Sequence, residues 1–250
     1  MYMELTNLVA SSKTSKVYRE DNQAIKVFEP GYSKVDVLLE SLNTARVELT
    51  GLNLPIIHSI STVDNNWAIT MNYIEGPTLA QLIKDNPEKT ETYLIKMVEH
   101  QLTIQSKKCP LLNKMKDKLR NQIQSLTCID DIKKYELLTR LDGMPNHDKL
   151  CHGDFNPRNI IVQGDNFYTL DWIHATQGNA SADVARSYLL FSLYNNSIAN
   201  MYMDIFCQMS DTRKSYVQQW LPIVAAAQLT KQKPEETELL MKWLDVVDYD

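Results

Sequence analysis

The first third of the chain alternates short apolar runs with turn residues, a pattern typical of antiparallel strands. The run AIKVF at residues 24–28 is rich in β-branched and aromatic residues, and residues 10–18 have the composition of a hairpin. Two further apolar runs, at residues 56–61 and 67–73, flank an Asp-Asn-Asn turn. Between these strands, apolar residues recur at helical spacing over residues 33–49. This part is therefore expected to form a small antiparallel sheet with one helix.

The rest of the chain mainly has the apolar periodicity of helices. The expected helices lie at residues 86–106, 111–126, 129–141, 181–194, 197–208, 212–228 and 235–247. Pro222 is expected to break or kink its helix, because an internal proline removes a hydrogen bond. Two apolar strands, at residues 160–162 and 167–170, interrupt the helical series. The pattern predicts an α+β fold with an N-lobe at residues 1–73 and a mostly helical C-lobe at residues 74–250.

Composition narrows the class of protein. With 44% hydrophobic and 23% charged residues over 250 positions, the chain resembles an ordinary folded soluble protein. The net charge of -5 argues against nucleic acid or an anionic membrane as a partner. No window has 18 uninterrupted apolar residues, and residues 1–5 do not resemble a signal peptide. The four cysteines form no C-x-x-C pair, so a reduced, cytoplasmic protein is expected, with its oligomeric state open.

The candidate chemistry lies in residues 151–159, which read CHGDFNPRN. Asp154 and Asn159 lie five residues apart in an expected loop, and the second of the two following strands ends just before Asp171. In phosphoryl transfer, one aspartate accepts the proton of the attacking hydroxyl, while an asparagine and a second aspartate hold Mg²⁺. This spacing matches the arrangement in protein kinases. A simple turn stabilised by Asp154 is the alternative for an isolated motif.

The sequence H-G-D-x-x-x-x-N, followed by a strand and Asp-Trp, resembles the aminoglycoside phosphotransferase and choline kinase family. The resemblance implies a protein-kinase-like fold and a Mg²⁺-dependent transfer of the ATP γ-phosphate to a small-molecule alcohol, with GTP as an alternative donor. It makes Asp154 the expected catalytic residue and Asn159 and Asp171 the metal ligands. His152 and Asp183 are expected to support the catalytic loop. Without Asp-Phe-Gly or Ala-Pro-Glu sequences, a protein kinase is disfavoured.

Lys26 lies inside an apolar strand, where an ammonium without a partner is costly to bury. The resemblance implies that Lys26 binds the nucleotide phosphates and that a carboxylate on the next helix holds it. Glu40 and Glu48 are the candidates, and Glu40 is favoured because it lies near the middle of that helix. The alternative is that Lys26 extends to solvent from an edge strand while Glu40 faces solvent.

The loop expected to cover the phosphates departs from the kinase pattern. Kinase hairpins usually carry glycines, but the first glycine here is Gly31, after the lysine. Ser11, Ser12 and Thr14 are the candidates for binding phosphate oxygens, and a solvated hairpin tip is the alternative. The missing glycines also support the alternative function, a nucleotide-binding pseudokinase that acts as a sensor or scaffold.

Residues 71–76, MNYIEG, resemble the hinge of this family, where backbone groups bind the adenine edge. Tyr73 and Ile74 are therefore the expected adenine-binding positions. Because such contacts come from the backbone, the side chains add little support. A strand end followed by a turn is the alternative at this segment.

The acceptor substrate is the least defined part of the prediction. The candidates for its pocket are Trp172, His174, Trp220, Trp243 and the tail at residues 245–250. An acidic tail beside tryptophan would suit an amine-bearing alcohol through carboxylate pairing and cation–π contact. The alternative is that Trp220 and Trp243 pack in the core and that the tail is a frayed terminus.

Overall fold

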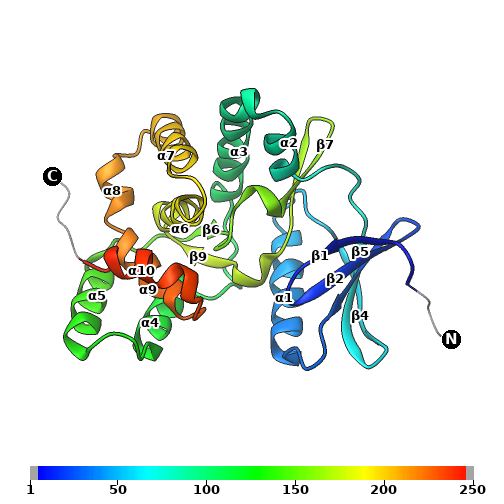
Figure 1. The fold of residues 1–250 in the computed structure, drawn as a ribbon, viewed down its shortest axis with the longest axis horizontal. Helices are drawn as coiled ribbons and strands as arrows, with labels where there is room; N and C mark the ends of the chain where they lie inside the picture. Colours follow the sequence, from blue (N-terminus) through cyan, green and yellow to red (C-terminus); the bar gives the residue numbers. More distant parts are fainter. Residues whose placement is uncertain (1–4, 246–250) are drawn as a thin grey trace. The chain divides into compact units, whose positions relative to one another are not determined.

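The computed structural model describes residues 5–245 and divides into two compact units (Figure 1). One unit comprises the chain up to Lys84 together with residues 157–174. The other comprises residues 85–156 and the chain from Ala175 onward. The sequence-based division into lobes at residue 73 stays a prediction.

The first unit is built on a five-stranded antiparallel sheet in the order β1-β2-β3-β5-β4. Its strands are β1 (Leu8–Ser11), β2 (Ser15–Glu20), β3 (Gln23–Phe28), β4 (Ile57–Val63) and β5 (Asn66–Asn72). Helix α1 (Lys34–Glu48) begins after Ser33, whose side chain accepts a hydrogen bond from the Asp36 N–H. Val37 of α1 is buried with Phe28 and Ile69 of the sheet. The predicted hairpin, strands and helix are confirmed.

A second hairpin completes this unit. Its strands are β7 (Ile160–Gln163) and β8 (Asn166–Thr169), both predicted from the sequence. The Val162 N–H donates to the Pro77 carbonyl (3.0 Å), and the Thr169 N–H donates to the Asn53 carbonyl (3.1 Å). Gly76 permits this approach, since its φ is 143° and an added Cβ would clash with the Val162 carbonyl oxygen. The backbone thus fixes the strands that flank the candidate metal ligands.

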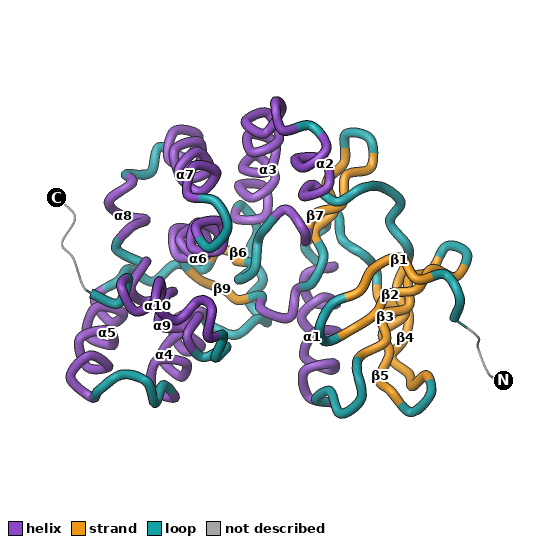
Figure 2. Tube along the Cα trace, viewed as in Figure 1, coloured by secondary structure: helices purple, strands orange, loops and turns teal. Residues whose placement is uncertain are grey.

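The second unit is mainly helical, as Figure 2 shows by colour. Its helices are α3 (Thr90–Gln105), α4 (Met115–Ser125), α5 (Asp131–Gly143), α6 (Ala180–Ser192), α7 (Asn196–Ser210), α8 (Lys214–Gln218), α9 (Leu221–Leu229) and α10 (Pro234–Lys242). Pro222 lies in the first turn of α9, so the helix predicted over residues 212–228 is divided as proline chemistry suggests. No described helix is both long and apolar enough to cross a membrane.

Several elements differ from the predictions. Helix α2 (Leu79–Asp85) lies in a stretch expected to be mainly helical but was not predicted as a separate helix, and the paired strands β6 (Lys149–Cys151) and β9 (Thr176–Gly178) were not predicted. Each strand has three residues, too few to show an alternating pattern, and α2 follows a Gly-Pro pair that reads as a turn. The last helix ends at Lys242 rather than at residue 247. Residues 246 and 247 lie outside the described part of the chain.

Candidate active site

Lys26 and Glu40 form an ion pair inside the first unit. The Lys26 Nζ lies 2.6 Å from the Glu40 Oε1, and both side chains are largely buried. Glu48 has a different role, because its carboxylate accepts a hydrogen bond from the Ile57 N–H (3.0 Å). Burial alone would lower the pKa of Lys26, but the carboxylates of Asp171 and Glu40 outweigh it and raise that pKa. Lys26 is therefore an ammonium at neutral pH, as phosphate binding requires.

Asp171 lies close enough to Lys26 and Glu40 for its carboxylate to raise the pKa of both groups. It directly follows Leu170 and has a φ of 61°, a left-handed conformation that is uncommon for residues other than glycine. Its Oδ1 atom is buried and has no hydrogen-bond partner among the described residues. A strained backbone and an unsatisfied carboxylate oxygen are typical of functional sites. Both features suit a residue that binds a cation.

Hydrogen bonds hold the segment around Asp171 in place. The Leu170 N–H donates to the Asn159 carbonyl (2.8 Å), which ties the two predicted metal-binding positions together. On the other side, the buried Asn43 of α1 donates through Nδ2 to the Ile173 carbonyl (3.1 Å). Asn43 could not be predicted from the sequence, because its contact with residue 173 depends on how α1 packs.

The donors at this site fit Mg²⁺. Mg²⁺ usually takes one or two carboxylates and completes its octahedral shell with phosphates and water. Across residues 5–245, no group of three or more His, Cys, Asp or Glu side chains forms a metal cage. The side-chain oxygens of Asn159 and Asp171 would hold the ion, with nucleotide phosphates as further ligands.

The loop with Asp154 belongs to the second unit and is held by Asp183. The Asp183 carboxylate accepts hydrogen bonds from the backbone N–H groups of His152 (3.2 Å) and Gly153 (2.7 Å). The Asp154 N–H in turn donates to the His152 Nδ1 (3.2 Å). Both side chains thus contact backbone groups of this loop, and the supporting role of His152 and Asp183 stays a prediction. Gly153 has a φ of 80°, a conformation that glycine adopts without strain.

The second half of this loop has its own contacts. The Asn156 Nδ2 donates to the Asp154 carbonyl (2.9 Å) and to its Oδ2 (3.3 Å). The Ser187 hydroxyl, on α6, donates to the Phe155 carbonyl (2.7 Å). The His100 ring lies 6.2 Å from the Phe155 ring, and burial lowers the pKa of His100 to about 4, with His152 adding to the shift. The loop with Asp154 is therefore fixed by both backbone and side-chain contacts.

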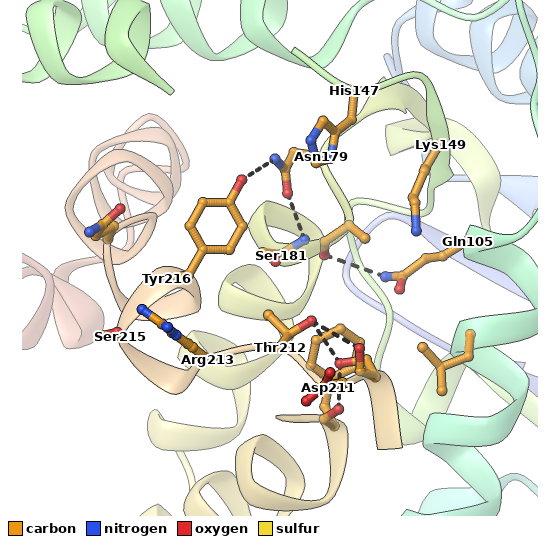
Figure 3. Close-up of a pocket in the computed structure, with 15 residues that line it drawn as sticks. Gln105, His147, Lys149, Asn179, Ser181, Asp211, Thr212, Arg213, Ser215 and Tyr216 are labelled. Carbon is orange, nitrogen blue, oxygen red and sulfur yellow. Dashed lines mark hydrogen bonds between the residues drawn. The ribbon is translucent and has the colours of Figure 1, made fainter. Parts of the chain in front are cut away.

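Helix α6, which carries Asp183, is itself anchored at its first turn (Figure 3). The Asn179 Oδ1 accepts from the Ser181 N–H (2.9 Å), while its Nδ2 donates to the Tyr216 hydroxyl (2.7 Å). The Gln105 Nε2 of α3 reaches the Ala180 carbonyl (3.4 Å). These residues line a cavity of about 620 Å³ in the second unit. Asn179 was not predicted as an N-cap, although an asparagine before a helical run is a recognisable signal for one.

The predicted phosphate-binding residues lie at the β1–β2 hairpin. Ser11 ends β1, and the Ser12 hydroxyl accepts hydrogen bonds from the N–H groups of Thr14 (3.2 Å) and Ser15 (3.0 Å). The Ser12 N–H donates to the Ser15 carbonyl (2.8 Å). These amides are thus engaged inside the turn. Phosphate binding by Ser11, Ser12 and Thr14 stays a prediction that relies on hydroxyl groups rather than amides.

The predicted hinge follows β5. The Tyr73 N–H donates to the Asn22 carbonyl (2.8 Å), and the Arg19 guanidinium carbon lies 4.3 Å from the centroid of the Tyr73 ring. The Ile74 side chain is buried. Adenine binding by Tyr73 and Ile74 stays a prediction. Because the Tyr73 amide already donates to the Asn22 carbonyl, we do not expect it to donate to the adenine.

The tryptophans proposed for the acceptor pocket have packing roles instead. Trp172 and Trp220 are at most 1% exposed, and the Trp172 indole donates to the Thr169 carbonyl (3.0 Å). Trp243 stacks on Tyr188, with ring centroids 5.9 Å apart. The alternative of core packing is therefore correct for Trp220. Of the acidic tail, Asp245 pairs with Lys133 (3.4 Å), and residues 246–250 lie outside the described part.

Solved structures of small-molecule kinases have the same fold. A mutant of aminoglycoside phosphotransferase APH(4)-Ia, in complex with ADP and hygromycin B, is 12% identical with a TM-score of 0.69, covering 94% of this chain and 89% of its own. A choline/ethanolamine kinase family protein from Mesorhizobium loti is 11% identical with a TM-score of 0.63, covering 99% and 89%. Amicoumacin kinase hAmiN, with AMP-PNP, Ca²⁺ and Ami, is 10% identical with a TM-score of 0.61, covering 96% and 86%. The predicted α+β, protein-kinase-like fold is confirmed.

Sequence comparison identifies the family. No curated protein matches the chain. The family described as "Phosphotransferase enzyme family", however, matches residues 71–240. The matched range includes the residues 151–171 on which the predicted resemblance was based, and it extends through most of the helical unit. Because it spans well over half of the sequence, the chain belongs to the phosphotransferase enzyme family.

Proposed function

We propose that the protein transfers the γ-phosphate of ATP to a hydroxyl group of a small molecule and requires Mg²⁺. The observation that carries this proposal is the Lys26–Glu40 ion pair, whose ammonium also interacts electrostatically with the carboxylate of Asp171. The Oδ1 atom of Asp171 has no hydrogen-bond partner among the described residues. An ammonium held by a carboxylate, beside a carboxylate available to a cation, is the charge pattern that a metal–nucleotide complex needs. The Asp154 loop, braced by Asp183, supplies the remaining chemistry.

The nucleotide side has separate tasks for its residues. Lys26 binds phosphate oxygens, and Glu40 keeps its ammonium in position. Asn159 and Asp171 would hold Mg²⁺, which neutralises developing charge on the phosphate oxygens when bound. GTP is the second candidate donor, since the hinge contacts would come from backbone groups that do not by themselves identify the base.

Asp154 acts on the acceptor. Its carboxylate orients the attacking hydroxyl and takes its proton as the oxygen bonds to the γ-phosphorus and the bond to the ADP oxygen breaks. The Asn156 amide contacts the Asp154 Oδ2 (3.3 Å) and so limits the rotation of this carboxylate. Acid–base assistance of this type typically contributes about 10²–10⁴ in rate.

The solved structures support a small-molecule acceptor and an adenine nucleotide. Their ligands include ADP or AMP-PNP together with hygromycin B or amicoumacin. None of these acceptors is assigned to the present protein. Identities of 12% and 10% support the fold alone, so the substrate has to be inferred from the residues of this chain.

The test is ADP release measured with ATP, Mg²⁺ and a panel of small alcohols, on the wild type and Asp154→Asn. We expect an acceptor-dependent release that the substitution reduces by about 10²-fold or more while nucleotide binding is retained. Equal turnover by both proteins would remove Asp154 from the mechanism.

A further inference from the structure

The cavity of about 620 Å³ in the second unit lies at the N-terminal end of helix α6 (Figure 3). Its volume is typical of sites that hold small molecules. Leu102 and Phe206 give it an apolar wall, and polar side chains make up most of its remaining lining. Asp154 is not among the lining residues, so the cavity is separate from the residue proposed to act on the acceptor.

Hydrogen bonds hold the walls of this cavity in place. At the start of α6, the Asn179 Nδ2 donates to the Tyr216 hydroxyl (2.7 Å). At the end of α7, the Ser210 hydroxyl donates to the Phe206 carbonyl (2.7 Å) and lies 2.9 Å from the Thr212 hydroxyl. Walls that are fixed before binding reduce the entropy that a ligand must overcome. The cavity is therefore suited to bind a ligand without rearrangement of its walls.

The lining has an excess of positive charge, although the net charge of the chain is -5. Lys149 and Arg213 contribute cations, and Asp211 is the one carboxylate among the lining residues. Within residues 5–245, no carboxylate forms an ion pair with Lys149 or Arg213. In the view of Figure 3, these two cations lie on opposite sides of the cavity. The arrangement favours a ligand with two anionic groups, since each could form charge-assisted hydrogen bonds with one cation.

Gln105 adds a hydrogen-bond acceptor to the same cavity. Its side chain is 2% exposed, and its Nε2 donates to the Ala180 carbonyl (3.4 Å). Its Oε1 has no hydrogen-bond partner within residues 5–245. A buried acceptor without a partner is rare in folded proteins and requires an explanation. A hydroxyl group of a ligand would supply the missing donor, and Figure 3 shows Gln105 on the same side of the cavity as Lys149.

The cavity is connected to the Asp154 loop through two elements. Lys149 begins β6, which ends at Cys151, directly before His152. Asn179 is the N-cap of α6, and Asp183 of this helix accepts hydrogen bonds from the loop amides. A ligand in the cavity would thus contact both elements from which the loop is held.

We propose that this cavity binds a small hydroxylated dianion, such as a hydroxy-dicarboxylate. Arg213 binds one anionic group through its fork of N–H groups, and Lys149 binds the other as a point charge. The Oε1 of Gln105 accepts the hydrogen of the ligand hydroxyl. This site is additional to the proposed function and does not depend on it, because no residue assigned to phosphoryl transfer lines the cavity.

The first experiment measures the binding of malate, a hydroxy-dicarboxylate, by calorimetry without nucleotide or Mg²⁺. We expect the wild type to bind malate, and Lys149→Met and Arg213→Met each to bind it at least about tenfold more weakly. Both residues are exposed, so neither substitution should affect folding. Lys96→Met changes an exposed lysine of α3 outside the cavity. It is the matched control and should bind malate like the wild type.

A second comparison tests the hydroxyl group. Succinate is the same dicarboxylate as malate without the hydroxyl. The wild type should bind succinate about three- to tenfold more weakly than malate, because succinate has no group that donates to the Gln105 Oε1. Gln105→Met lacks this oxygen and should bind the two ligands with equal affinity.

Each contrary result overturns a defined part of the proposal. No malate binding by the wild type would overturn the site. Equal malate affinity in the wild type, Lys149→Met and Arg213→Met would also overturn it and leave both residues as solvated surface cations. Equal affinity of the wild type for malate and succinate would overturn the selection for a hydroxyl.

Lys26→Met separates this site from the proposed function. The variant should lose Mg²⁺–ATP binding but keep malate binding. Loss of malate binding in Lys26→Met would place malate at the nucleotide site and overturn the cavity as its site. Intact Mg²⁺–ATP binding in the same variant would contradict the proposed function without affecting the cavity.

Discussion

The Lys26 Nζ lies 2.6 Å from the Glu40 Oε1, and this contact joins strand β3 to helix α1 where both side chains are largely buried. A buried ion pair adds little net stability, because desolvation offsets the attraction. Loss of one partner is different, since it leaves an uncompensated charge. The pair is therefore better understood as a contact that fixes the position of the Lys26 ammonium than as a source of stability.

Glu40→Gln should weaken Mg²⁺–ATP binding by about 10- to 100-fold, because Lys26 loses its oppositely charged partner. The free energy of unfolding should fall by about 3–5 kcal/mol for the same reason. Calorimetric titration and denaturant unfolding measure the two effects. Glu48→Gln is the matched control: its side chain still accepts from the Ile57 N–H, so ATP affinity should not change. Equal ATP affinity in the two variants would contradict the role of Glu40.

Asp183→Asn should lower turnover while leaving the KM for ATP unchanged. Asparagine keeps one acceptor oxygen but places an NH₂ group against the second loop amide, so the His152–Gly153 segment loses a charge-assisted hydrogen bond. We expect a loss of about 1–3 kcal/mol in the free energy of unfolding. Asp204→Asn removes an exposed ion pair with Lys214 and should cost less than about 1 kcal/mol. Unchanged turnover in Asp183→Asn would show that the brace is not needed.

The protein should lose stability between pH 6.5 and about 4 because of His100. The folded-state pKa of His100 is about 4, below the ordinary value of 6.5, so the unfolded chain binds the proton more readily. The stabilisation is complete above pH 6.5 and disappears as the pH falls toward 4, by up to about 3 kcal/mol. Denaturant unfolding at several pH values measures this slope. His100→Gln should flatten it, and an equally steep slope in that variant would assign the effect to another group.

Gly76→Ala should destabilise the first unit by at least about 3 kcal/mol, since the added methyl would meet the Val162 carbonyl and the φ of 143° is strained for alanine. Gly143→Ala is the matched control, with nothing within 4 Å of the added carbon. At the end of α5 it should be neutral or stabilising by up to about 1 kcal/mol. Thermal unfolding compares the two, and similar midpoints would contradict the close approach of Gly76 to β7.

The predictable parts of the molecule are those determined by local sequence. Strand β3, helix α1 and the hairpin after Asn159 follow from apolar periodicity and turn residues. The positions of Asp154, Asn159 and Asp171 follow from a spacing within one short stretch of chain. Such features need no knowledge of how distant segments pack.

The remaining features depend on tertiary contacts. Glu40 and Glu48 lie on the same helix, and only the packing of α1 on the sheet directs Glu40 toward Lys26. Ser12 binds amides of its own turn, which composition alone does not reveal. Arg186 reads as an ordinary exposed helical arginine, and only the packing of α6 buries it.

The measurement that tests the central claim most directly is a thermal-shift titration with ATP and with GTP, each with and without Mg²⁺, on the wild type and Asp171→Ala. A ligand that binds only the folded state raises the unfolding midpoint by mass action, so no acceptor is required. We predict a Mg²⁺-dependent rise in the wild type that is lost in Asp171→Ala. An equal Mg²⁺-dependent rise in both proteins, or no rise in the wild type with ATP or GTP, would contradict the proposed nucleotide site.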